Sequence, residues 1–181
     1  MGEIWIGTSG WHYKHWLGNF YPPRLPAARM LTHYIRYFDT VELNNTFYKL
    51  PAATSLQVWR DSTPPNFRFA VKGSRFLTHM KKLNNAQEGL NRFFAAIEIL
   101  EPKLGPVLFQ LPPLWEVNFD RLAAFLEILP RYRRYAFEFR NPTWDIPAIY
   151  DLLAKYNAGY CIFDLARYLS PIQVTADFSY I

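Results

Sequence analysis

Short strand-like runs alternate with helix-like segments along the whole chain, and no other feature restricts the possible folds as strongly. The strand-like runs begin at Ile4, Thr40, Phe67, Pro106, Tyr135 and Gly159, and a seventh begins at Phe178. Between them apolar residues recur at helical spacing, as Leu90, Phe93 and Ile97 do within 88–100. This alternation predicts βαβ units and a parallel sheet, arranged either as an open doubly wound sheet or as a barrel.

One further observation weakens the open-sheet alternative, and another bears on the number of domains. The sequence contains neither GxGxxG nor GxxxxGK[ST], which weakens the case for a nucleotide-binding open sheet. No linker or low-complexity segment divides the 181 residues, so we expect one domain over 1–181. A complete (βα)8 barrel typically needs about 250 residues. We therefore predict an α/β, TIM-barrel-like parallel barrel of about six βα units plus the start of a seventh strand, incomplete at its C-terminus.

Polar residues recur late in the strand-like runs, always on one face. Residues two apart in a strand share a face, so Glu138 and Arg140 lie opposite Tyr135, Phe137 and Phe139 in "YAFEFR". The same comparison selects Glu42, Asn44, Lys72, Gln110 and Asp164 in the other runs. Because a TIM barrel carries its chemistry at the C-terminal ends of its strands, we expect these side chains to meet at one mouth.

Charged side chains in an apolar strand are costly unless they are paired. One interpretation is therefore a buried ion-pair network of Glu138, Arg140 and Lys72 that only supports the fold. The other is a functional site, in which neighbouring acids and bases shift one another's pKa values. Several charges at one end of a sheet favour the site.

Six separated motifs resemble, in the same order, those of the YecE-like family of unknown function, number 72 among the domains of unknown function. They are IGTSGW, VELNNTFY, FAVKGS, LFQLPP, FEFRNPTW and FDL. The resemblance runs over essentially the whole chain and implies a TIM-barrel-like fold, but it implies no established reaction. The matching positions are Gly7, Thr8, Ser9, Gly10, Trp11, Glu42, Asn44, Phe47, Tyr48, Lys72, Gln110, Pro112, Glu138, Arg140, Trp144 and Asp164.

Acid/base catalysis on a small polar or anionic ligand is the main functional hypothesis. Its catalytic candidates are Glu42, Lys72, Glu138 and Asp164, because paired carboxylates serve glycoside and related polar-substrate chemistry. Whether the chain is an enzyme stays open, and a hydrolase or a lyase is the class that this chemistry would suit. A Schiff base on Lys72 is a further alternative.

The ligand-binding candidates are Ser9, Trp11, Asn44, Tyr48, Gln110, Arg140 and Trp144. Arg140 would hold a carboxylate or phosphate, and the aromatic residues would supply stacking walls. Packing in the core is the alternative for the tryptophans. Ser9 lacks a GxSxG context and Cys161 lies in an apolar strand, so the sequence predicts neither as a nucleophile.

No cofactor is predicted, since neither HExxH nor a CxxC pair occurs. Glu42, Glu138 and Asp164 offer a carboxylate set for Mg²⁺ or Mn²⁺ as an alternative.

Binding or processing of nucleic acid is a second functional hypothesis, from a different class. Residues 1–90 carry a net charge of +6 and residues 91–181 a net charge of −1. The loop 10–24 interleaves Lys14 and Arg24 with five aromatic residues, a composition suited to stacking on unpaired bases. An aromatic loop that closes over the barrel mouth is the alternative interpretation. A fragment without activity of its own is the third hypothesis.

The single cysteine, Cys161, excludes an intramolecular disulfide framework. The N-terminus lacks the pattern of a secretory signal, and no apolar stretch approaches the roughly 18 residues that span a bilayer. We therefore expect a cytoplasmic protein with no membrane partner.

Overall fold

A computed structural model describes residues 2–165 and 168–181, and a six-stranded parallel sheet organises them. The strands are β1 (Gly7–Ser9), β2 (Thr40–Leu43), β3 (Arg68–Lys72), β4 (Leu104–Leu111), β5 (Tyr135–Phe139) and β6 (Gly159–Tyr160). Each strand pairs with the next in chain order, which is the strand order of a TIM-barrel wall. The predicted TIM-barrel-like α/β arrangement is confirmed.

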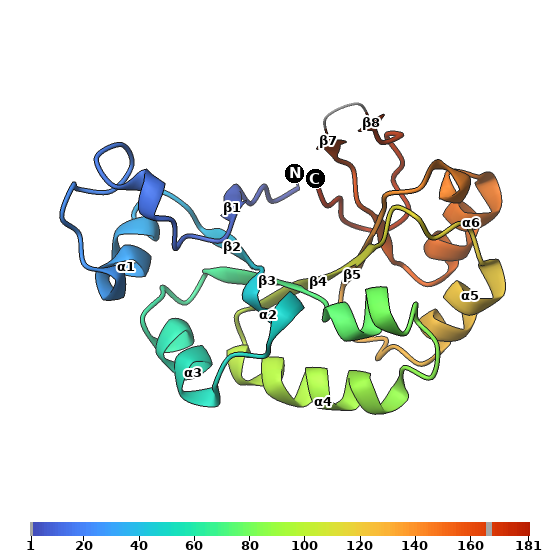
Figure 1. The fold of residues 1–181 in the computed structure, drawn as a ribbon, viewed down its shortest axis with the longest axis horizontal. Coiled ribbons are helices and arrows are strands. Elements are labelled where there is room, and N and C mark those ends of the chain that lie inside the picture. The colour runs from blue at the N-terminus through green and yellow to red at the C-terminus, as the bar shows by residue number, and fades with distance from the viewer. Residues whose placement is uncertain (1, 166–167) are drawn as a thin grey trace.

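Helices connect the strands and cover one face of the sheet. They are α1 (Met30–Tyr34), α2 (Asn45–Tyr48), α3 (Ala53–Asp61), α4 (Gln87–Ile97), α5 (Phe119–Glu127) and α6 (Pro147–Lys155). Short 3-10 helices span Lys14–Trp16 (η1), Ala27–Arg29 (η2), Glu98–Leu100 (η4) and Pro142–Trp144 (η5), and a π-helix spans Phe76–Met80 (η3). Figure 1 shows the helices outside the curved sheet and both chain ends on its open, concave side.

The face of the sheet under the helices carries the aromatic residues, as the alternation predicted. Phe109, Phe137 and Phe139 are fully buried, and Phe125 of α5 meets Phe109 edge-to-face with 5.0 Å between ring centroids. Burying one such side chain contributes about 1.5–3 kcal/mol. This packing fixes the opposite face of every strand toward the concave side.

The sixth strand is shorter than predicted. The sequence suggested a strand from Gly159 to Asp164, but β6 ends at Tyr160 and only a single bridge, Cys161 to Tyr180, continues it. Beyond that bridge the backbone of Phe163 bonds to Ser170 instead. Asp164 therefore lies in β7 (Asp164–Leu165), which pairs antiparallel with β8 (Tyr168–Leu169) in a separate sheet.

The ends of the sheet also differ from the prediction. The first run was expected to begin at Ile4, yet β1 starts at Gly7, because Gly7 pairs with Thr40, the first residue of β2. Ile4 and Ile6 are consequently exposed. The expected seventh strand at Phe178 is reduced to the bridge at Tyr180, which is parallel to Cys161 and places Tyr180 next to β6.

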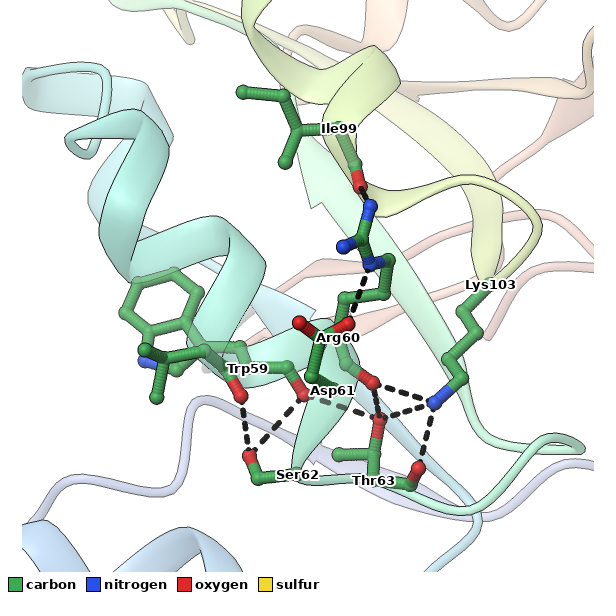
Figure 2. A network of polar contacts seen from close by, with 8 residues as sticks. Trp59, Arg60, Asp61, Ser62, Thr63, Ile99 and Lys103 are labelled. Atoms are coloured by element: carbon green, nitrogen blue, oxygen red, sulfur yellow. Dashed lines mark hydrogen bonds and ion pairs between the residues drawn. The ribbon is translucent and has the colours of Figure 1, made fainter.

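A buried lysine closes the C-terminal end of α3 (Figure 2). Lys103 is 9% exposed, and its Nζ donates to the carbonyl oxygens of Arg60 at 2.5 Å and Thr63 at 2.6 Å, and to Thr63 Oγ1 at 3.1 Å. A cation suits this position, since the last carbonyls of a helix lack backbone donors and carry its negative dipole end. Burial lowers the pKa of the Lys103 ammonium. The contact joins the residue just before β4 to the end of α3 and the turn that follows it.

Replacing Lys103 by Met should lower the free energy of unfolding by about 1–3 kcal/mol, because buried acceptors would lose their donor. Urea unfolding followed by circular dichroism measures the change. Lys14→Met, at an exposed lysine, is the control and should change stability by less than about 0.5 kcal/mol. Equal midpoints for both variants would contradict a stabilising role for Lys103.

Candidate functional site

The concave face of the sheet bounds one large cavity of about 1480 Å³. Its lining includes seven of the residues that the sequence selected: Ser9, Glu42, Lys72, Gln110, Glu138, Arg140 and Asp164. Six of these come from the ends of β1 to β5, and Asp164 comes from β7. The alternation of faces therefore predicted the six residues from the parallel sheet correctly, whereas Asp164 reaches the cavity from the separate β7–β8 pair.

Glu138 is buried, and both of its carboxylate oxygens accept hydrogen bonds. Only 6% exposed, it accepts hydrogen bonds from Gln110 Nε2 at 2.9 Å (Oε1) and 2.8 Å (Oε2), and from Arg140 Nε at 2.6 Å (Oε1). Strand pairing places Gln110 directly beside Glu138, while Arg140 is the next residue on the same face. With both oxygens occupied, this carboxylate is suited to orienting Arg140.

Two cationic side chains line the cavity near this carboxylate. Arg140 uses Nε for Glu138, and its side chain is 33% exposed. Lys72 makes no ion pair with any residue in 2–165 or 168–181, and its Nζ lies 5.5 Å from the centroid of the Phe47 ring. Among the described residues Lys72 therefore lines the cavity without a carboxylate partner, while the lining as a whole contains six Asp or Glu and five Lys or Arg side chains.

Glu42 has hydroxyl partners instead of a cation. Ser9 Oγ donates to Oε1 at 2.6 Å, and the Tyr180 hydroxyl donates to Oε2 at 2.6 Å. Asn44 Nδ2 in turn donates to Ser9 Oγ at 2.7 Å. Burial, followed by the charge of Glu42, raises the pKa of Tyr180, so that its phenol stays protonated and remains a donor.

Three aromatic candidates lie outside the cavity lining. Trp11 is buried and packs edge-to-face on Trp59, with 5.1 Å between ring centroids. Trp144 is fully buried, and its Nε1 donates to the Trp115 carbonyl at 2.7 Å. Tyr48 is exposed at the end of α2. The tryptophans thus take the core positions that the packing alternative described.

The carboxylates do not gather as a metal-ligand set. Asp164 is exposed on β7, whereas Glu42 and Glu138 are each held by partners of their own. Among residues 2–165 and 168–181 no group of three or more His, Cys, Asp or Glu side chains is placed to hold a metal ion.

Sequence reasoning did not single out Tyr180, which lines this cavity, or His79, which lies close enough to feel the charges of Lys72 and Arg140. Tyr180 reaches Glu42 from a segment that was interpreted only as a partial strand. His79, in η3, stands edge-to-face on Phe47 at 5.0 Å, and its Nδ1 lies 2.9 Å from Thr78 Oγ1. Burial lowers the pKa of His79, and the positive charges of Arg75, Arg140 and Lys72 lower it further. Both positions depend on long-range packing, which no local motif signals.

The remaining candidates for other chemistries are engaged in packing. Burial, with the charges of Glu138 and Glu42, raises the pKa of Cys161 and keeps the thiol protonated. In the first loop Trp16 packs on Tyr13 at 4.9 Å and on Phe20 at 5.6 Å between ring centroids.

None of the helices in the described part of the chain has the length and apolar character needed to cross a bilayer.

Comparisons with known proteins agree on one family. Residues 5–181 match the family model described as "Protein of unknown function DUF72". The UPF0759 protein YecE of Escherichia coli (strain K12) is 31% identical over 140 residues, which are 77% of this chain and 49% of that protein. The UPF0759 protein YunF of Bacillus subtilis (strain 168) is 29% identical over 161 residues, which are 82% of this chain and 54% of that protein. The chain thus spans about half the length of these curated relatives.

Solved structures carry the same family name. A DUF72 family protein from Thermotoga maritima MSB8 is 30% identical, with a TM-score of 0.85 over 97% of this chain and 72% of that one. A DUF72 family protein from Enterococcus faecalis V583 is 21% identical, with a TM-score of 0.71 over 93% of this chain and 65% of that one, and supports the fold alone.

The lowered pKa of His79 predicts a loss of stability in mild acid. The unfolded chain takes up a proton near pH 6.5, whereas the folded imidazole takes it up only at lower pH. Unfolding therefore binds protons just below pH 6.5, and stability should fall as the pH drops from 7 toward 5.5. Thermal unfolding across this range should show a shallower slope for His79→Gln. His12→Gln, at an exposed histidine, should keep the wild-type slope; a slope unchanged in both variants would contradict the assignment.

Proposed function

The chain belongs to the DUF72 family of proteins of unknown function, as its six motifs predicted, and on that premise we propose that its cavity binds a small polar anion beside a carboxylate acid/base. Lys72 and Arg140 hold the anion. Glu42 exchanges a proton with the bound molecule. A hydrolase or a lyase is the class that this arrangement suits.

The observation that carries the proposal is that Lys72 has no carboxylate partner among the described residues and that Arg140 is paired only through its Nε. Arg140 and Lys72 both line the cavity, while Glu138 is the one carboxylate that pairs with either of them in the described part of the chain. A cation facing a partly enclosed cavity attracts an anion more strongly than one in open water, because the effective dielectric constant is lower.

Arg140 is also pre-oriented. Its Nε is fixed on Glu138, which leaves the two terminal nitrogens of the guanidinium as donors for a ligand. A planar guanidinium with set orientation recognises a carboxylate or phosphate by paired hydrogen bonds. Glu138 thus acts as a positioning residue for Arg140, which joins the ion-pair interpretation of the sequence with the site interpretation.

Glu42 is the better placed of the two glutamates for proton transfer. Glu138 is surrounded by two amide hydrogen bonds and a guanidinium, whereas Glu42 meets only hydroxyl and phenol donors. A hydroxyl partner can give up or take back a proton during a reaction, and a guanidinium does not. The roles of Glu42 and Glu138 are therefore separate.

Nucleic acid remains the alternative ligand, from the basic N-terminal half and the aromatic first loop. Trp16 of that loop, however, packs on Tyr13 and Phe20 and is partly buried against the core. A stacking platform needs free ring faces. The cavity anion is the proposal that the contacts support better.

Lys72→Met should weaken binding of malonate or inorganic phosphate, which titration calorimetry at low salt measures. A hydrogen bond to a charged group contributes about 1.5–3 kcal/mol, so the affinity should fall about tenfold or more. Lys49→Met, at an exposed lysine just after α2, is the matched control and should bind like the wild type. Absent binding in the wild type, or equal loss in both variants, would overturn the proposal.

Glu138→Gln should reduce both stability and anion binding, in contrast to Lys72→Met. The amide would set its NH2 group against that of Gln110 and would lose the ion pair with Arg140. We expect the free energy of unfolding to fall by about 1–2 kcal/mol in urea titrations. Glu116→Gln, at an exposed glutamate, should leave stability and binding unchanged. Loss of stability with unaltered anion affinity would show that Glu138 does not position Arg140.

A further inference from the structure

We propose that Ser9 is a nucleophile activated by Glu42, and that the cavity hydrolyses esters of short dicarboxylic acids. The serine and its base are argued from their own geometry. The choice of an anionic substrate rests on the proposed function of Lys72 and Arg140.

The hydrogen bonds around Ser9 Oγ determine which atom its hydroxyl proton faces. Asn44 Nδ2 donates to Ser9 Oγ at 2.7 Å, so this oxygen acts as an acceptor toward Asn44. Its own hydrogen then lies on the 2.6 Å contact with Glu42 Oε1. One lone pair of Oγ is left without a partner among the described residues, and Ser9 is an exposed residue in the lining of the cavity. The oxygen is therefore accessible to an electrophile.

The base is itself held in place by a third group. Tyr180 donates to Glu42 Oε2 at 2.6 Å, which turns Oε1 toward Ser9. Strand pairing sets Ser9 directly beside Glu42. A nucleophile within hydrogen-bond reach of a base, with that base oriented by a third residue, is the arrangement that activates a serine hydroxyl. Ser9 has this arrangement of nucleophile, base and orienting group although it lacks the GxSxG context.

The spacing between Ser9 and Lys72 indicates the length of the substrate. Glu42 pairs with Ala70, and Lys72 is the next inward-facing residue of β3. Strand spacing of roughly 4.8 Å and a rise of roughly 3.3 Å per residue put the Cα atoms of Ser9 and Lys72 roughly 12 Å apart. An acyl chain of a few carbons would span that interval, from an ester carbonyl at Ser9 to a carboxylate held by Lys72.

The reaction balances within the site plus one water molecule. Ser9 Oγ attacks the ester carbonyl and forms the acyl–oxygen bond while Glu42 takes the serine proton. The bond to the alcohol breaks, and Glu42 passes the proton to the leaving oxygen. Water then attacks the acyl-serine, Glu42 accepts the proton from that water, and Ser9 Oγ departs and recovers it. The products are the alcohol and the dicarboxylic acid, whose new carboxyl group keeps the second proton of the water and releases it to solvent at neutral pH.

The cavity offers a matched control for Ser9. Ser179 also lines it and is exposed, yet its hydroxyl makes no hydrogen bond to a carboxylate within the described residues. Ser179 therefore shares access to the cavity with Ser9 but lacks the base.

The test is acid-quenched mass spectrometry of the protein after exposure to mono-p-nitrophenyl succinate. The wild type should carry one succinyl group, and peptide mapping should place it on Ser9. Ser9→Ala should lose the adduct, and Ser179→Ala should keep it. Glu42→Gln should slow acylation by about a hundredfold or more, the usual contribution of a general base. Circular dichroism checks that each variant is folded.

Several results would overturn the inference: no adduct on the wild type, an adduct retained in Ser9→Ala, or equal labelling of Ser179. The outcome is separable from that of the anion proposal. Malonate binding that persists in a wild type that is never acylated removes the nucleophile alone. Acylation of Ser9 at the same rate in wild type and in Lys72→Met removes the anion site alone.

Discussion

Burial of the aromatic face of the sheet under the helices is the constraint on which the rest of the molecule depends. Phe137 and Phe139 lie two residues apart in β5, Phe109 is paired with Phe137 from β4, and all three are fully buried. A slip of one residue in any strand would turn these rings to the concave side and the charges to the core. The cost of that exchange fixes the register, and the register places Glu42, Lys72 and Glu138 around one cavity.

On that concave face two glutamates have opposite surroundings. Glu138 is balanced by a guanidinium and an amide, so its charge is compensated where water is scarce. Glu42 is balanced by the hydroxyls of Ser9 and Tyr180, which are weaker partners but can exchange protons. In the function proposed above, Glu138 therefore orients Arg140 and Glu42 exchanges the proton. The motif FEFRNPTW contains Glu138 and Arg140, the ion pair on this face.

The regular features could be predicted from the sequence, and the irregular ones could not. The period of two identified the inward faces, so Glu42, Lys72, Gln110 and Glu138 were expected together before any contact was known. For Trp11 and Trp144 the sequence left a ligand wall and core packing both open, because an aromatic residue in a loop gives no sign of whether it turns inward; both are buried. Asp164 lies outside the parallel sheet because the backbone of Phe163 is hydrogen-bonded to Ser170. Tyr180 and His79 depend on contacts between distant segments, which local patterns do not encode.

The hydrogen bond from Tyr180 to Glu42 joins residues 138 positions apart in the chain. Closing a flexible loop of that length costs about 4 kcal/mol of entropy, far more than one hydrogen bond returns. We therefore expect this bond to form after the strands between its partners have assembled. We therefore expect the Glu42 carboxylate to reach its final orientation late in folding, after the Lys72 and Arg140 side chains are already in place.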